Sequence, residues 1–177
     1  QNILKYGGLK KYMPTTTSVF LIGSLAIAGF PGFSGFFSKD EILWHSYANG
    51  GIIFWVIGVI TAALTAFYTF RLFTLTFLDK PRFDVSKIHP HESPKVMTMP
   101  LIILAFLSIA GGFIGVPEFI FGEGSNKFAL WLDPVFEKAK ILSFHSHHIE
   151  HSHITELILM SIAIIISLSF MYFAYKM

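Results

Sequence analysis

The stretch GFPGFSGFFSKDEIL, residues 29–43, interrupts a long apolar block that spans about residues 14–48. A proline inside a helix removes a backbone donor and clashes with the preceding turn, and each glycine lowers helix propensity by about 1 kcal/mol. A continuous helix through this stretch is therefore unfavourable. The sequence predicts a break, whose hinge residues are Gly29, Pro31, Gly32 and Gly35.

The length of the same block also favours a discontinuous helix. As one helix it would extend about 52 Å at 1.5 Å per residue, which exceeds the roughly 40 to 45 Å of a whole bilayer. Two half-helices that meet inside the membrane fit better, with Ser38 as the N-cap of the second half and Asp40 and Glu41 in its first turn. The alternative is a full helix that ends at Phe30 and a separate surface helix that begins at Phe36.

The composition predicts a membrane protein. Of the 177 residues, 53% are apolar, which is more than an average soluble domain reaches even when glycine is counted. These residues fall into blocks with few charges, and the blocks have about the length that a helix needs to cross the hydrocarbon layer. We expect an all-α, polytopic membrane fold with about four spans, at residues 14–48 (discontinuous), 52–77, 96–117 and 154–177.

The segments between the apolar blocks set the expected domains and topology. Residues 1–117 are predicted to form part of one transmembrane bundle, residues 118–153 a polar, histidine-rich loop, and residues 154–177 a further span. Lys and Arg cluster in alternate loops, and the positive-inside rule then places the 118–153 loop on the outer side of the membrane. Because the sequence opens on Gln1 and stops after an apolar run, we expect an excerpt of a longer polypeptide.

Composition also excludes several kinds of function. The sequence has no cysteine, which excludes disulfides, thiolate zinc sites and iron–sulfur clusters held by this chain. The net charge of +2 is small, and the basic residues lie in loops, which suits contact with membrane lipids and not nucleic-acid binding. Walker A and GxGxxG motifs are missing, so neither nucleotide hydrolysis nor NADH binding is expected in this chain.

Three charged residues, Lys39, Asp40 and Glu41, directly follow the predicted break. A charge inside the bilayer costs at least about 2.5 to 3.5 kcal/mol unless it is paired or hydrated, so a charge at this depth usually marks a function. Burial disfavours the ammonium form of a lysine, and a buried lysine can therefore bind and release protons. We predict a proton relay of Lys39 and Asp40, with Glu41 as a candidate partner. The alternative is a local charge cluster at a water interface.

A polar pathway is predicted along the span 52–77, where four hydroxyl-bearing residues recur at helical spacings of three and four: Thr61, Thr65, Tyr68 and Thr69. A stripe of hydroxyl groups can line a water-filled path, although it is more often a feature of helix packing. An arginine near the end of a span can also act as a simple interfacial anchor. The candidates are Thr61, Thr65, Tyr68 and Arg71.

The segment HSHHIEHSH, residues 145–153, places His147 and His151 four residues apart. This spacing on a helix can hold zinc, copper or nickel. Histidines in an outward loop usually bind metal only adventitiously, so no functional metal site is predicted, and these two histidines are the candidates if one exists.

Several motifs resemble one known family. The 29–43 stretch is similar to the signature of the antiporter-like membrane subunits of respiratory complex I, the NADH-quinone oxidoreductase, and within that family to the subunit L type. GGLKKYMP before the break, AFYTFRLFTLTF in the next span and HPHESP before the third agree with the family in order and spacing. Lys39 favours subunit L, because the sister subunits tend to carry glutamate there. The 118–153 segment carries no recognised motif.

The resemblance implies the following role. In the family the helix that matches residues 14–48 is discontinuous, and the lysine at the position of Lys39 ends a chain of protonatable groups near the exit channel, with Asp40 as its neighbour. The chain would then move protons while quinone reduction proceeds elsewhere in the complex. The resemblance places it in the bacterial inner membrane as a multi-pass subunit.

The same resemblance defines the expected cofactors and partners. We expect no cofactor in this chain, whereas NADH, FMN, iron–sulfur clusters and quinone would bind to partner subunits. The partners would be other membrane subunits of complex I, especially the adjacent antiporter-like subunit, and membrane lipids. One alternative is the large subunit of a multi-subunit sodium/proton antiporter. A second is a membrane scaffold with a metal-binding, histidine-rich loop.

Overall fold

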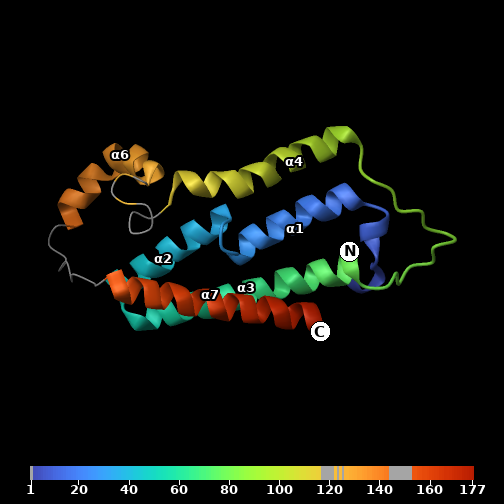
Figure 1. The fold of residues 1–177 in the computed structure, drawn as a ribbon, viewed down its shortest axis with the longest axis horizontal. Helices are drawn as coiled ribbons and strands as arrows, with labels where there is room; N and C mark the ends of the chain where they lie inside the picture. The colour runs from blue at the N-terminus through green and yellow to red at the C-terminus, as the bar shows by residue number, and fades with distance from the viewer. Residues whose placement is uncertain (1, 117–121, 123, 125, 144–152) are drawn as a thin grey trace.

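The computed structural model describes residues 2–116, 122, 124, 126–143 and 153–177. Within these residues the regular elements are helices, and an isolated bridge pairs Gly115 with Asn126. Figure 1 shows long helices that run roughly parallel or antiparallel to one another along the longest axis of the molecule. The predicted all-α membrane fold is confirmed.

The first apolar block forms two helices, as predicted. Helix α1 covers Pro14–Ala28 and helix α2 covers Ser34–Gly50, and they follow one another across the middle of Figure 1. Gly29, which ends α1, has a φ of +78°, a left-handed conformation that glycine adopts at little cost. The chain therefore turns at this glycine instead of continuing the helix.

Helix α2 begins one turn earlier than the sequence suggested. Its N-cap position is Phe33, with no side-chain cap, and Ser38 lies inside the helix, where its hydroxyl donates weakly to the carbonyls of Ser34 and Gly35. The prediction that Ser38 caps the helix is therefore wrong, and Asp40 and Glu41 do not lie in the first turn. The early start is possible because Gly35 has no side chain to separate the first turn of α2 from the last turn of α1.

Three further helices are long and apolar enough to cross a membrane. The second block forms α3 (Ile52–Phe73), which continues into η3, a π-helical turn over Thr74–Leu78. The third forms α4 (Lys95–Ala110) with the 3-10 turn η4 (Gly111–Ile114), and the last forms α7 (His153–Lys176). Among the described residues the candidate spans are Ile52–Leu78, Lys95–Ile114 and Ile154–Lys176, and Pro14–Ala28 is a shorter apolar helix.

Helix α3 packs against α7, α2 and α1. Small residues line these contacts and let the helix backbones approach closely, as is usual in membrane bundles. One buried cluster joins α1, α3 and α7, and a second joins α2, α3 and α7. The first consists of Ala28, Ala66, Phe70, Met171 and Ala174, and the second of Leu43, Trp55, Val59 and Ala163.

Large apolar side chains cover much of the outer surface. Ile53 on α3 is 69% exposed, Ile103 on α4 57% and Ile165 on α7 63%. A soluble protein of this size rarely exposes contiguous apolar surface on this scale. Lipid or neighbouring membrane helices are the surroundings that such a surface fits.

The segment predicted as a polar loop contains a helix. Helix α6 covers Lys127–Ser143 and lies in Figure 1 beyond the end of α4. The apolar patch around Phe128 was visible in the sequence, but the proline at position 134 and the surrounding polar residues obscured the helical pattern.

Two sets of long-range hydrogen bonds stabilise the end of the bundle that lies away from α6, where α1 begins and η3 ends (Figure 1). The Glu92 carboxylate, in the loop before α4, accepts hydrogen bonds from the amides of Thr15 and Thr16 and from the Thr16 hydroxyl, so it caps the N-terminus of α1. Arg82 donates to the carbonyls of Leu4 and Leu75 and pairs with Asp79.

Candidate functional site at the broken helix

Lys39 extends from α2 back to the end of α1. Its Nζ donates a hydrogen bond to the carbonyl oxygen of Ala28, the last residue of α1, over 3.3 Å. The last carbonyls of a helix have no intrahelical partner and carry the negative end of the helix dipole. In an unbroken helix the Ala28 carbonyl would accept a backbone hydrogen bond. Because the helix breaks here, this carbonyl is available to the Lys39 amine.

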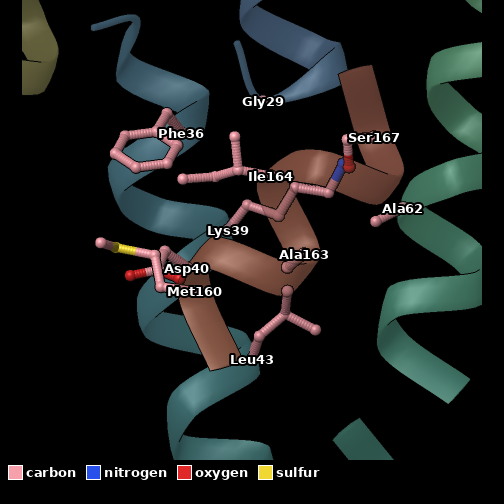
Figure 2. Close-up of a pocket in the computed structure, with 10 residues that line it drawn as sticks. All are labelled: Gly29, Phe36, Lys39, Asp40, Leu43, Ala62, Met160, Ala163, Ile164 and Ser167. Carbon is pink, nitrogen blue, oxygen red and sulfur yellow. The ribbon is translucent and has the colours of Figure 1, made fainter. Parts of the chain in front are cut away.

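The Lys39 side chain lies along a small cavity of about 20 Å³ between α2, α3 and α7. A space of this size is enough for about one water molecule. Figure 2 shows that the amine crosses from α2 toward α7 and ends beside Ser167. Most of the surrounding side chains are apolar, and the residues that line the cavity are Gly29, Phe36, Lys39, Asp40, Leu43, Ala62, Met160, Ala163, Ile164 and Ser167.

Asp40 lines the same cavity, as the predicted relay requires. It is also close enough to Glu156, in the first turn of α7, and to Glu41 for the carboxylates to repel one another. Within the described part of the chain, the ion pairs are Arg82–Asp79 and Lys87–Asp84, and neither involves Lys39. Lys39 and Asp40 therefore share one site without being locked in a salt bridge.

Glu41 lies on a different face of α2. It lines a larger cavity of about 1010 Å³ with Ser38 and His45 from α2 and with residues of η4 and α6. The structure therefore brings Lys39 and Asp40 together but directs Glu41 to the far side of the helix.

The hydroxyl groups of the candidate pathway on α3 bond within their own helix. Thr61 Oγ1 donates to the carbonyl of Ile57 and Thr65 Oγ1 to the carbonyl of Thr61, at 2.8 and 2.7 Å. Tyr68 is 58% exposed, and Arg71 lies half-buried in the last turn of the helix. None of the four lines the cavity at Lys39, and a polar pathway along them stays a prediction.

The candidate metal ligands His147 and His151 lie outside the described residues. Among the residues that the structure does describe, no group of three or more His, Asp or Glu side chains is arranged to hold a metal ion.

Sequence reasoning missed Ser167 and Glu156, the polar residues that α7 brings to the site. A serine in the middle of an apolar span and an acidic residue at its start were the available signals. Neither signal reveals a partner more than a hundred residues away, because the contact depends on how α7 packs on α2 and α3.

Fold and site together define a multi-span helical membrane protein with a discontinuous helix and a lysine–aspartate site at its break. A family model described as "NADH:quinone oxidoreductase/Mrp antiporter, TM" matches residues 1–65, which include α1, the break, α2 and the first part of α3.

The names of similar curated proteins also point to a membrane subunit of a quinone oxidoreductase. The chain is 43% identical over 136 residues to NAD(P)H-quinone oxidoreductase chain 5 of Picosynechococcus sp., covering 66% of this chain and 20% of the relative. It is 44% identical over 140 residues to the chloroplastic subunit 5 of Chaetosphaeridium globosum, covering 75% and 20%. It is 39% identical over 144 residues to NADH-ubiquinone oxidoreductase chain 5 of Cryphonectria parasitica, covering 77% and 22%.

The chain spans about a fifth of the length of these relatives. Over the matched region it is a homologue of subunit 5 of the NAD(P)H-quinone oxidoreductases, the antiporter-like membrane subunit of complex I. The family resemblance inferred from the motifs is confirmed at this level.

Proposed function

We propose that this chain is part of a proton-translocating membrane subunit of NADH-quinone oxidoreductase, of the subunit L type, in a bacterial cell membrane. The observation that carries the proposal is the contact between the Lys39 amine and the Ala28 carbonyl inside a broken apolar helix. A cation at this place is costly unless it is paired or hydrated, so its presence there usually marks a function. The relatives named chain 5 or subunit 5 support the same assignment.

The site offers a simple proton cycle. In its charged form Lys39 is stabilised by the Ala28 carbonyl and by the C-terminal end of α1. Asp40 lines the same cavity, forms no salt bridge with Lys39, and is itself repelled by the charges of Glu156 and Glu41. A change in the charge of one carboxylate therefore changes how strongly Lys39 holds its proton. Redox events in partner subunits would drive such changes.

The proposed partners follow from this role. The chain would pack within its own longer subunit and against other membrane subunits of the complex, especially the adjacent antiporter-like one. NADH, FMN, iron–sulfur clusters and quinone would be bound by those other subunits. The exposed apolar side chains of α3, α4 and α7 are the surfaces available for this packing.

A second candidate is the large subunit of a multi-subunit sodium/proton antiporter. The description of the matching family model names both kinds of protein, so it favours neither. The relatives from Chaetosphaeridium globosum and Cryphonectria parasitica, which match 75% and 77% of this chain, are named as subunits of quinone oxidoreductases, which supports the redox-coupled complex.

The decisive experiment is Lys39→Ala in the full-length subunit, assembled into the complete complex and reconstituted into liposomes. Assembly is expected to stay intact, because Lys39 makes one hydrogen bond and no ion pair among the described residues. The number of protons moved per NADH oxidised is expected to fall, whereas Lys87→Ala, at an exposed loop position, leaves it unchanged. An unchanged stoichiometry in Lys39→Ala would refute the relay, and sodium-driven proton movement without NADH would favour the antiporter.

A further inference from the structure

Ser167 is a buried polar residue in the middle of an apolar helix. Its residue exposure is 7%, and it lines the water-sized cavity that contains the Lys39 amine. In Figure 2 the hydroxyl oxygen of Ser167 and the nitrogen of Lys39 face each other at one end of the cavity. The two side chains come from helices α7 and α2, which are far apart in the sequence.

The hydrogen bonding of Ser167 differs from that of its neighbours on α7. Ser161 and Ser169 are exposed, and each donates to the carbonyl four residues earlier, over 2.7 Å. This back-bonding is the usual way in which a serine satisfies its hydroxyl inside a helix. Among the described residues, Ser167 makes no such bond, so its hydroxyl is available to the cavity and to Lys39.

A hydroxyl suits a group that changes its protonation state. An ammonium has donors only, and Ser167 Oγ can accept from it. A neutral amine has a lone pair, and the same hydroxyl can rotate and donate to it. The Ala28 carbonyl serves only the first purpose, because it has no proton to donate.

Other groups around the amine cannot replace the serine. From α2 the charged neighbours are Asp40, in the cavity, and Glu41, on the other face. From α7 the charged neighbour is Glu156, which acts on Asp40. From α3 the cavity receives Ala62, which has no polar side-chain atom.

We propose that Ser167 is a positioning residue for Lys39, which, with one water molecule in the adjoining cavity, hydrogen-bonds the lysine in both its charged and its neutral form. Helix α7 is thereby part of the relay and not only a packing partner. This inference rests on the proposed function of Lys39.

The test compares three variants of the full-length subunit in the reconstituted complex. Ser167→Ala removes the hydroxyl and leaves the size of the side chain nearly unchanged. Ser161→Ala and Ser169→Ala are matched controls, because they lie on the same helix and lose a hydroxyl that is bonded within it. Proton pumping per NADH is measured as a function of pH, together with assembly and thermal stability.

Ser167→Ala is expected to lower the pumping rate about fivefold, the effect of one lost hydrogen bond, and to shift the pH at which pumping is half-maximal. The controls keep the parent profile. The double variant Lys39→Ala/Ser167→Ala pumps no less than Lys39→Ala alone, because both residues act through one group. A Ser167→Ala profile that overlays the controls would overturn the inference.

A further variant separates positioning from packing. Ser167→Cys keeps the volume and a weak donor, and its pumping rate should lie between those of the parent and Ser167→Ala. If Ser167→Ala and Ser167→Cys both fail to assemble, the serine is a packing residue and the inference is wrong. If Lys39→Ala leaves proton stoichiometry unchanged, the proposed function itself fails. If Lys39→Ala lowers proton stoichiometry but Ser167→Ala has the pumping profile of the parent, the proposed function stands and only the inference about Ser167 is wrong.

Discussion

Gly29 lies so close to Lys39 that a Cβ added to the glycine would stand 3.1 Å from Cδ of the lysine and 3.6 Å from its Nζ. The same glycine has a φ of +78°. One residue thus serves two purposes, since it lets the chain leave α1 and leaves room for the lysine to reach the end of that helix.

Substitution of this glycine should disturb both functions. Gly29→Ala is expected to cost about 1 to 2 kcal/mol through its left-handed backbone and to push Lys39 away from Ala28, so proton pumping in the complete complex should fall. Gly32→Ala is the control, because Gly32 has a φ of +91° and nothing within 4 Å of an added Cβ. Thermal unfolding should show similar losses for the two variants. Equal pumping in both would contradict a role of Gly29 in placing the lysine.

The close approach of α1 and α2 should be sensitive to a single methyl group. A Cβ at Gly35 would lie 1.9 Å from the carbonyl oxygen of Ala26, so Gly35→Ala must separate the two half-helices, and overpacking of this kind costs about 1 to 3 kcal/mol. Gly23→Ala is the comparison, since nothing lies within 4 Å of its Cβ and alanine is the better helix former. The yield of monodisperse complex should fall only for Gly35→Ala, and a normal yield would count against the packing described here.

Glu92 should stabilise the bundle in a pH-dependent way. Burial by itself raises the pKa of Glu92, but hydrogen bonds from Thr16, Thr15 and Ser93 outweigh it, so the pKa of this carboxyl lies below its ordinary value of 4.5. A carboxyl whose pKa is lower in the folded state stabilises fully above the unfolded value. This stabilisation is lost as the pH falls from 4.5 through the folded pKa.

Glu92→Gln is therefore expected to lower stability at neutral pH by about 0.5 to 2 kcal/mol, the usual effect of losing a helix cap. It should also remove part of the acid sensitivity below pH 4.5. Thermal unfolding between pH 3 and 7 measures both effects. Asp84→Asn is the control at neutral pH, because that carboxylate bonds only within its own loop. Identical pH curves for parent and Glu92→Gln would disprove the cap.

Arg82 should hold the N-terminal segment against the end of α3. Its guanidinium donates to the carbonyls of Leu4 and Leu75, and lysine cannot reproduce this planar, forked geometry. Arg82→Lys is expected to release η1 (Ile3–Lys5), seen as faster amide hydrogen exchange in that segment. Lys87→Met, which removes one exposed ion pair, should leave exchange there unchanged. Unaltered protection in Arg82→Lys would show that other contacts suffice.

The membrane fold could be predicted because it depends on local composition. Apolar blocks of bilayer length must form helices, since every backbone polar group needs a partner inside the lipid. The predicted spans 52–77 and 154–177 agree closely with α3, η3 and α7. The break was also local, because proline and glycine act on the backbone within a turn or two.

The start of α2 could not be predicted in the same way. Ser38 is a good N-cap residue in isolation, but the contact of Gly35 with Ala26 allows the helix to begin at Ser34. That shift changes which turn carries Asp40 and Glu41. The earlier start does not change the angles between Lys39, Asp40 and Glu41 around the helix axis. Lys39 and Asp40 therefore line one cavity and Glu41 lines another.

By itself the sequence determined that this chain is a bundle of membrane helices with one broken span and a lysine–aspartate pair beside the break. Only the tertiary structure decided which groups meet the lysine. The turn at Gly29 leaves the Ala28 carbonyl without a helical partner, so that it can accept from Lys39, and Ser167 comes to the same cavity from α7, whose Glu156 acts on Asp40. The physical reason is that helix formation and breaking depend on near neighbours in the chain. The partners of a buried amine depend on packing between helices that are distant in sequence.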